Sequence, residues 1–157
     1  MVRSVTRLAV LVLVVLALAG CSGSDDAPDE DPGTFAVTLL RQLDRGQSAS
    51  AWEELHPLHR DSVSRAAYVR CVRGDPIEGT VTSIDVLGVS EEPARVPGRA
   101  EDEDSTAVKL RYRLRVPGGG APRPYDLTVH LFAVDGRWSW VIGPSDYAAY
   151  ADGRCPS

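Results

Sequence analysis

Residues 106–116 alternate strictly between apolar and cationic side chains, and this pattern constrains the fold more than any other part of the chain. Successive side chains of a β-strand point to opposite faces, so the stretch predicts a strand with one buried face and one face in water. Such a strand belongs in an antiparallel sheet covered on one side. The apolar positions are Val108, Leu110, Tyr112, Leu114 and Val116, and the cationic positions are Lys109, Arg111, Arg113 and Arg115.

Residues 125–133 form a second alternating run, which leads into Asp135-Gly136. An Asp-Gly pair between such runs is the strongest short signal for a β-hairpin. The turn fixes the register, and the register places Trp138, Trp140 and Ile142 on the apolar side of the preceding strand. The expected pairs are Val134 with Arg137, Ala133 with Trp138, Leu131 with Trp140, and Val129 with Ile142.

The part of the chain before the strands has helical spacing. Residues 34–46 repeat apolar side chains at four-residue intervals, with Thr34 as the expected cap and Gly46 as the stop. Ser50 opens a capping box for a short second helix, and a third helix should start near Ser64. Three helices are therefore expected before the first strand.

The first strand is less regular than the later ones. Residues 77–89 are rich in β-branched side chains, but their alternation slips near Ser83, which predicts a bulge. Residues 90–104 are acidic, contain proline and are expected to form a loop. Helices followed by an antiparallel meander predict an α+β domain over residues 34–157, with the N-terminal helices packed on a curved sheet of about four strands.

The N-terminus has the layout of an export signal. Arg3 and Arg7 precede an apolar run over residues 8–18, which is too short to span a bilayer comfortably. The sequence Leu18-Ala19-Gly20-Cys21 then resembles the bacterial lipobox. This resemblance implies cleavage before Cys21, diacylation of its thiol, and a lipid-anchored position on the extracytoplasmic face of the cell membrane.

These features divide the chain into three parts. Residues 1–20 are expected to be a cleaved signal peptide. Residues 21–33 are expected to be the lipidated cysteine and a flexible tether, because they contain five acidic residues and no large apolar side chain. Residues 34–157 are the predicted folded domain.

With Cys21 lipidated, Cys71 and Cys155 remain as an even pair. In an oxidising compartment such a pair predicts a disulfide. The alternative is a buried free thiol at Cys71.

The charge of the mature chain limits its partners. Without residues 1–20, 15 basic and 22 acidic side chains remain, a net charge of −7, which argues against a general affinity for nucleic acid or an anionic lipid surface. The row formed by Lys109, Arg111, Arg113 and Arg115 is the exception. It is either a surface for an anionic wall polymer or acidic partner protein, or a solvated face whose charges pair with Asp126 and its neighbours.

The order of elements resembles the NTF2-like, or cystatin-like, superfamily as found in small actinobacterial lipoproteins. The resemblance covers roughly residues 34–143 and lies in four segments, which are 35–46, 51–57, 64–71 and 134–140. It implies a cone whose mouth binds small apolar molecules, and some members are isomerases or dehydratases. Fold alone is a poor guide to function.

A cone of this kind suggests a possible pocket, for which the alternative is ordinary core packing. Asp85 is the candidate base, because the face of its strand on which it lies cannot be assigned from the sequence. The candidate pocket residues are Trp52, Tyr112, Tyr125, Trp138, Trp140 and Asp85.

Three histidines are candidate metal ligands. His56 and His59 are three residues apart, but Pro57 lies between them and no third ligand is evident. We therefore expect surface or capping histidines, with His130 on the polar face of its strand. No metal and no cofactor are expected.

Together these observations predict a membrane-anchored, extracytoplasmic lipoprotein. Its domain is expected to be a non-catalytic module that binds an envelope protein, a wall polymer or a small apolar ligand. The alternative is a small isomerase, dehydratase or carrier that uses an apolar cone.

Metabolic labelling with palmitate should modify the protein, because the thiol of Cys21 is the expected acylation site. An unlabelled product, with the thiols of Cys71 and Cys155 titrating freely in a lysate, would contradict both the anchor and the oxidising compartment.

Overall fold

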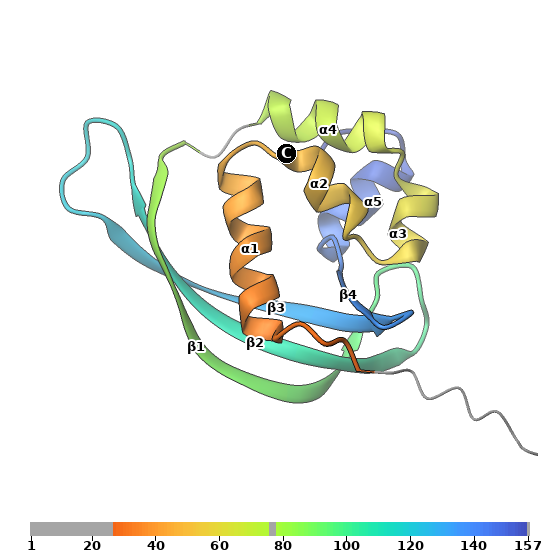
Figure 1. The fold of residues 1–157 in the computed structure, drawn as a ribbon. Coiled ribbons are helices and arrows are strands. Elements are labelled where there is room, and N and C mark those ends of the chain that lie inside the picture. Colours follow the sequence, from red (N-terminus) through yellow and green to blue (C-terminus); the bar gives the residue numbers. More distant parts are fainter. Residues whose placement is uncertain (1–26, 76–77, 157) are drawn as a thin grey trace, which may run out of the picture.

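A computed structural model describes residues 27–75 and 78–156 and shows an α+β arrangement. One antiparallel sheet has the strand order β1-β2-β3-β4, and the helices lie on its concave side (Figure 1). The predicted signal peptide, Cys21 and residues 22–26 of the predicted tether lie outside the described residues, and the last two tether residues, Pro32 and Gly33, already belong to the first helix. The elements are α1 (Pro32–Asp44), α2 (Ser48–Glu53), α3 (Pro57–Ser62), α4 (Arg65–Gly74), β1 (Thr80–Arg95), β2 (Asp102–Arg115), β3 (Arg123–Val134), β4 (Arg137–Trp140) and α5 (Pro144–Ala151).

Helix α1 begins two residues earlier than predicted. The Asp31 carboxylate accepts hydrogen bonds from the N–H (2.8 Å) and the hydroxyl (2.9 Å) of Thr34. Asp31 is therefore the cap and Thr34 is not, because Pro32, which needs no hydrogen-bond partner for its nitrogen, takes the first turn. Gly46 has a φ of +69°, which confirms it as the residue where the helix stops.

The short helices differ from the prediction in two places. Helix α2 begins at Ser48 without a side-chain cap, so the capping box at Ser50 is wrong. Helix α3 was not predicted, since a proline that usually ends a helix is here in its first turn. Helix α4 is confirmed, and the hydroxyl of Ser64 accepts the N–H of Ala67 at 3.3 Å.

Strands β1 and β2 extend through most of the segment predicted as a loop. The ladder continues to Arg95 paired with Asp102. The Thr106 hydroxyl donates to the Glu91 carboxylate at 2.8 Å. The acidic composition of the segment gave no indication of this long-range contact. Pro93 is tolerated because β1 is an edge strand. The register shift between Val81 and Ser83 confirms the predicted bulge.

The two-faced character of β2 is confirmed. Val108 and Leu110 are buried in the core with α1, and the cationic side faces away from the helices, but Tyr112 and Leu114 are only half-buried, and Val116, just beyond the strand, is 38% exposed. Burial of Val108 and Leu110 on this face contributes apolar area to the first core. The buried members of this first core include Phe35, Ala36, Leu39, Val108, Leu110 and Leu131.

A second core lies where α4, α5 and the chain after β4 meet. It contains Leu55, Tyr68, Ile142 and Tyr150. The predicted disulfide is present at its edge, with an S–S distance of 2.01 Å and a Cα–Cα distance of 5.3 Å between Cys71 and Cys155. The bond fastens the C-terminal tail to α4.

The hairpin between β3 and β4 is confirmed for the pairs from Val134–Arg137 to Leu131–Trp140. Asp135 and Gly136 both have positive φ, 51° and 71°, as a type I′ turn requires. The expected pair of Val129 with Ile142 is wrong, because β4 ends at Trp140.

The helices cover only part of the sheet. The connection between β2 and β3 extends well beyond them, at the end opposite the β1–β2 connection (Figure 1). The indole N–H of Trp138 donates to the Glu30 carbonyl at 2.7 Å, so the described N-terminal segment lies beside β4. Among the described residues, no helix combines the length and apolar character needed to cross a membrane.

Replacing both Cys71 and Cys155 with Ala should lower the free energy of unfolding by about 4–5 kcal/mol, because the bond closes a long loop in the unfolded chain. Urea denaturation measures this loss. A gain of about 2 Da in intact mass under reductant should verify the bond in the parent protein. Equal unfolding midpoints for the two proteins would contradict the prediction.

Candidate binding groove

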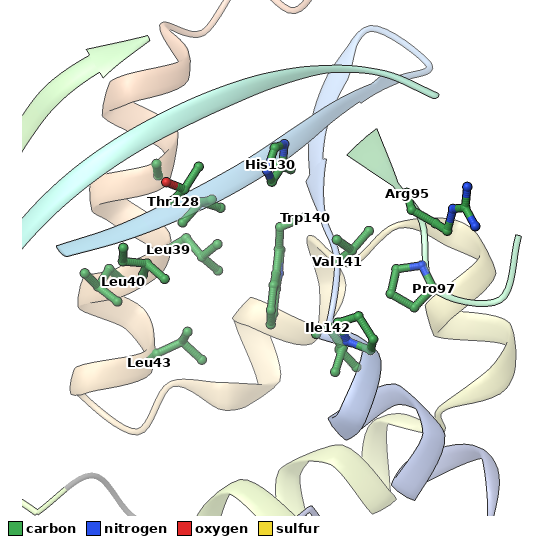
Figure 2. A pocket seen from close by; sticks show the side chains of 15 residues that line it. Leu39, Leu40, Leu43, Arg95, Pro97, Thr128, His130, Trp140, Val141 and Ile142 are labelled. Carbon is green, nitrogen blue, oxygen red and sulfur yellow. The ribbon is translucent and has the colours of Figure 1, made fainter. Parts of the chain in front are cut away.

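An apolar groove lies between α1, the edge of β3 and the chain that follows β4 (Figure 2). Its cavity volume is about 390 Å³, which is in the range of small-molecule sites. The polar side chains in its lining are Arg95, Thr128 and His130. Its principal apolar walls are Leu39, Leu40, Leu43, Val129, Trp140 and Ile142.

The groove exists because β4 leaves β3 after Trp140. The N–H of Trp140 donates to the Glu54 carbonyl at 3.0 Å, and the His56 N–H donates to the Trp140 carbonyl at 2.8 Å. The backbone of Trp140 is thus bonded to the segment between α2 and α3. The chain beyond it diverges from β3 and leaves an open wedge.

The wedge leaves part of β3 without a neighbour. Residues 127–130 have no strand partner on this side within the described part of the chain. Ile142, expected opposite Val129, lies in the second core instead, where its N–H donates to Nδ1 of His59 at 3.0 Å. The groove therefore occupies the place where continued pairing would have put another strand.

Trp140 forms the central wall of the groove. Its indole N–H donates to the Ala51 carbonyl at 2.8 Å, which fixes the ring. Figure 2 shows the indole between the leucines of α1 and Ile142. A rigid aromatic wall of this kind favours binding of an apolar group.

His130, on the polar side of the groove, lies beside Ser105, which does not line the groove, and the pair does not form an activated nucleophile. The hydroxyl of Ser105 donates its one proton to the Glu92 carbonyl at 2.6 Å. Nδ1 of His130, 3.1 Å from the same oxygen, must then carry a proton and donate to it. His130 in this tautomer cannot remove the proton of Ser105, so the pair lacks the arrangement needed for covalent catalysis.

The expectation of surface histidines at positions 56 and 59 is wrong. His59 is completely buried and His56 is 4% exposed. Nδ1 of His56 does accept the Leu58 N–H at 3.3 Å, so its expected capping role is present. The described residues contain no group of three or more potential metal-ligating side chains.

His59 connects three parts of the structure. Its Nδ1 accepts the Ile142 N–H, and its Nε2 lies 3.0 Å from the Pro97 carbonyl. The ring also stacks on Tyr147, with centroids 4.5 Å apart. Because the first nitrogen accepts and the second donates, the imidazole is neutral. Burial lowers the pKa of His59 below its ordinary value.

A carboxylate suited to proton transfer lies elsewhere. Burial raises the pKa of Glu54, whose carboxylate accepts a hydrogen bond from Gln42 at 3.1 Å. Glu54 lines a separate hollow beside Trp138 and Arg137. The apolar groove and this carboxylate are therefore not parts of one site.

The six candidate pocket residues do not come together. Tyr112 and Tyr125 stack on each other across two strands, with ring centroids 5.4 Å apart. Asp85 is exposed and pairs in register with Arg111, on the face away from the helices. Trp52 donates to a backbone carbonyl near α4, and Trp138 is at the Glu54 hollow. Only Trp140 of the six lines the apolar groove.

The cationic row is exposed on the outer face of β2. Arg111 forms a bidentate pair with Asp126, with both N–O distances 2.7 Å. For Arg111, this pair supports the interpretation that the row is a solvated face whose charges pair with Asp126. Lys109, Arg113 and Arg115 have no ion pair among the described residues.

Sequence reasoning missed the leucines of α1 as groove residues, although their four-residue spacing was visible. Their spacing indicates a buried face but does not show where the elements that cover this face end.

No protein-family model matches this chain, and no curated protein matches it. The assignment of the groove therefore depends on its geometry.

The protein should lose stability as the pH falls below about 6.5, and His59 should contribute to this loss. The unfolded chain protonates His59 at a higher pH than the folded chain does, so acid favours unfolding. In His59→Gln, which keeps a donor and an acceptor but does not titrate there, the free energy of unfolding should depend less steeply on pH between about 6.5 and 5. Denaturant titrations of both proteins in the same buffers measure the slopes, and parallel curves would contradict the prediction.

Proposed function

We propose that this protein is a lipid-anchored binding module on the extracytoplasmic face of the cell membrane, with an NTF2-like domain that holds a small apolar ligand. The observation that carries the proposal is the apolar groove, with Trp140 as a fixed wall and leucines of α1 opposite it. Apolar burial supplies the affinity, and the few polar groups at one side would orient the ligand.

The curved sheet with helices on its concave face supports the NTF2-like assignment. The disulfide supports an oxidising location, since such bonds are rare in reducing compartments. The contact of Trp138 with Glu30 leaves residues 21–29 between the proposed lipid and the domain. Nine residues reach at most about 30 Å, so the domain would stay close to the membrane.

The catalytic alternative receives less support. The titratable side chains that line the groove are Arg95 and His130, and His130 donates to Ser105. Glu54, whose raised pKa would suit a general acid, faces another hollow. We therefore favour binding without chemistry.

The groove is tested with a fluorescent apolar probe, 1-anilinonaphthalene-8-sulfonate, on the purified full chain. Leu127 also lines the groove, and Leu127→Gln, which places a polar group there, should weaken probe binding about tenfold, the loss expected when about 1.4 kcal/mol of apolar contact is removed. Leu127 is 38% exposed, so the substitution should leave the fold intact.

Leu87→Gln is the matched control, because Leu87 is 51% exposed and lies on β1 outside the groove. It should bind the probe as the parent protein does. Equal weakening in both variants, or no binding by the parent, would overturn the proposal. Native mass spectrometry of protein from its own host should then identify a bound apolar molecule.

A further inference from the structure

The charges of this chain are separated along the β-hairpins. Residues 105–125 contain five cationic side chains and no acidic one, in a chain whose net charge is −5. Residues 91–104, directly before them, contain six acidic side chains and two arginines. Such a separation creates a cationic and an acidic region on one molecule.

These two regions lie at opposite ends of the sheet. Strand β2 begins at Asp102 and ends at Arg115, and 14 strand residues extend about 45 Å. The acidic β1–β2 connection is at one end, and the β2–β3 connection, with Arg115 and Arg123 beside it, is at the other (Figure 1).

The N-terminal segment lies at the acidic end. Register pairs Thr106 with Leu131, so the turn at Asp135 is beside the β1–β2 connection. Trp138, just after that turn, holds the Glu30 carbonyl. A chain that continues from there to a lipid anchor leaves the molecule at its acidic end, with the cationic end directed away from the membrane.

The cations on the outer face differ in availability. Arg111 is held by Asp126 and lies opposite Asp85. The register neighbours of the others are uncharged: Lys109 lies between Gly88 and Thr128, Arg113 between Ser83 and Pro124, and Arg115 opposite Thr80. These three side chains are exposed. They are therefore available to an external anion.

The spacing of these cations along β2 favours an extended ligand over a small ion. Alternate residues of a strand are about 6.8 Å apart and project in parallel, so their charges do not converge on one small ion. A linear polymer with repeated negative charges can contact them in succession. Guanidinium groups also match the oxygen geometry of phosphate.

We propose that the outer face of β2, through Lys109, Arg113 and Arg115, binds a linear phosphodiester polyanion of the cell envelope. The inference depends on the proposed anchoring only for its orientation, because the anchor would direct the cationic end of this strand away from the membrane. Phosphatidylglycerol headgroups share the same chemistry, but the acidic end of the molecule lies between the cationic face and the anchor.

The test measures binding of the purified full chain to poly(glycerol phosphate) in solution, as a function of salt concentration. The affinity should fall with salt, and Arg113→Gln/Arg115→Gln should bind at least about tenfold more weakly at low salt. The slope of log affinity against log salt should become shallower by about two.

The control is Arg70→Gln/Arg73→Gln, which removes the same charge from exposed positions on α4. It should bind as the parent does. If both double variants bound the polymer equally weakly, the loss would be explained by net charge alone, and the proposal would be overturned. Absence of polymer binding, or binding only to phosphatidylglycerol vesicles, would also overturn it, whereas the probe measurement on the groove would be unaffected.

Discussion

The backbone of Trp140 is the point on which the rest of this structure depends. Its N–H and carbonyl bond to the segment between α2 and α3 rather than to a longer β3–β4 ladder. Its indole is fixed on Ala51 at the same time. One residue thus ends the sheet, joins it to the helices and creates the wall of the groove. Ile142, two residues further along, belongs to the second core, against which Trp140 also packs.

His59 completes this connection from the other side. It joins α3 to the Ile142 backbone and to the β1–β2 connection, and it lies under Tyr147 of α5. A buried polar group is stabilising only when all of its hydrogen bonds are made. The small helices, each too short to be stable alone, therefore depend on a few such long-range bonds as well as on apolar packing.

The sequence predicted those features that local chemistry determines. Alternation over residues 106–116 predicted the two faces of β2, and Asp135-Gly136 predicted the turn and three of the four expected pairs of the register. The extension of β1 through Glu91 and Pro93 was not predictable, because it depends on pairing with a distant strand. The groove was not predictable either, since its walls come from separate segments and its opening depends on a bond from Trp140 to Glu54.

The disulfide has a consequence for the covalent architecture. Cys71 and Cys155 are 84 positions apart, and all four strands lie between them. A protease that cuts the glycine-rich connection between β2 and β3 would leave two fragments still joined through sulfur. A cut at this turn would therefore keep both halves of the sheet in one molecule.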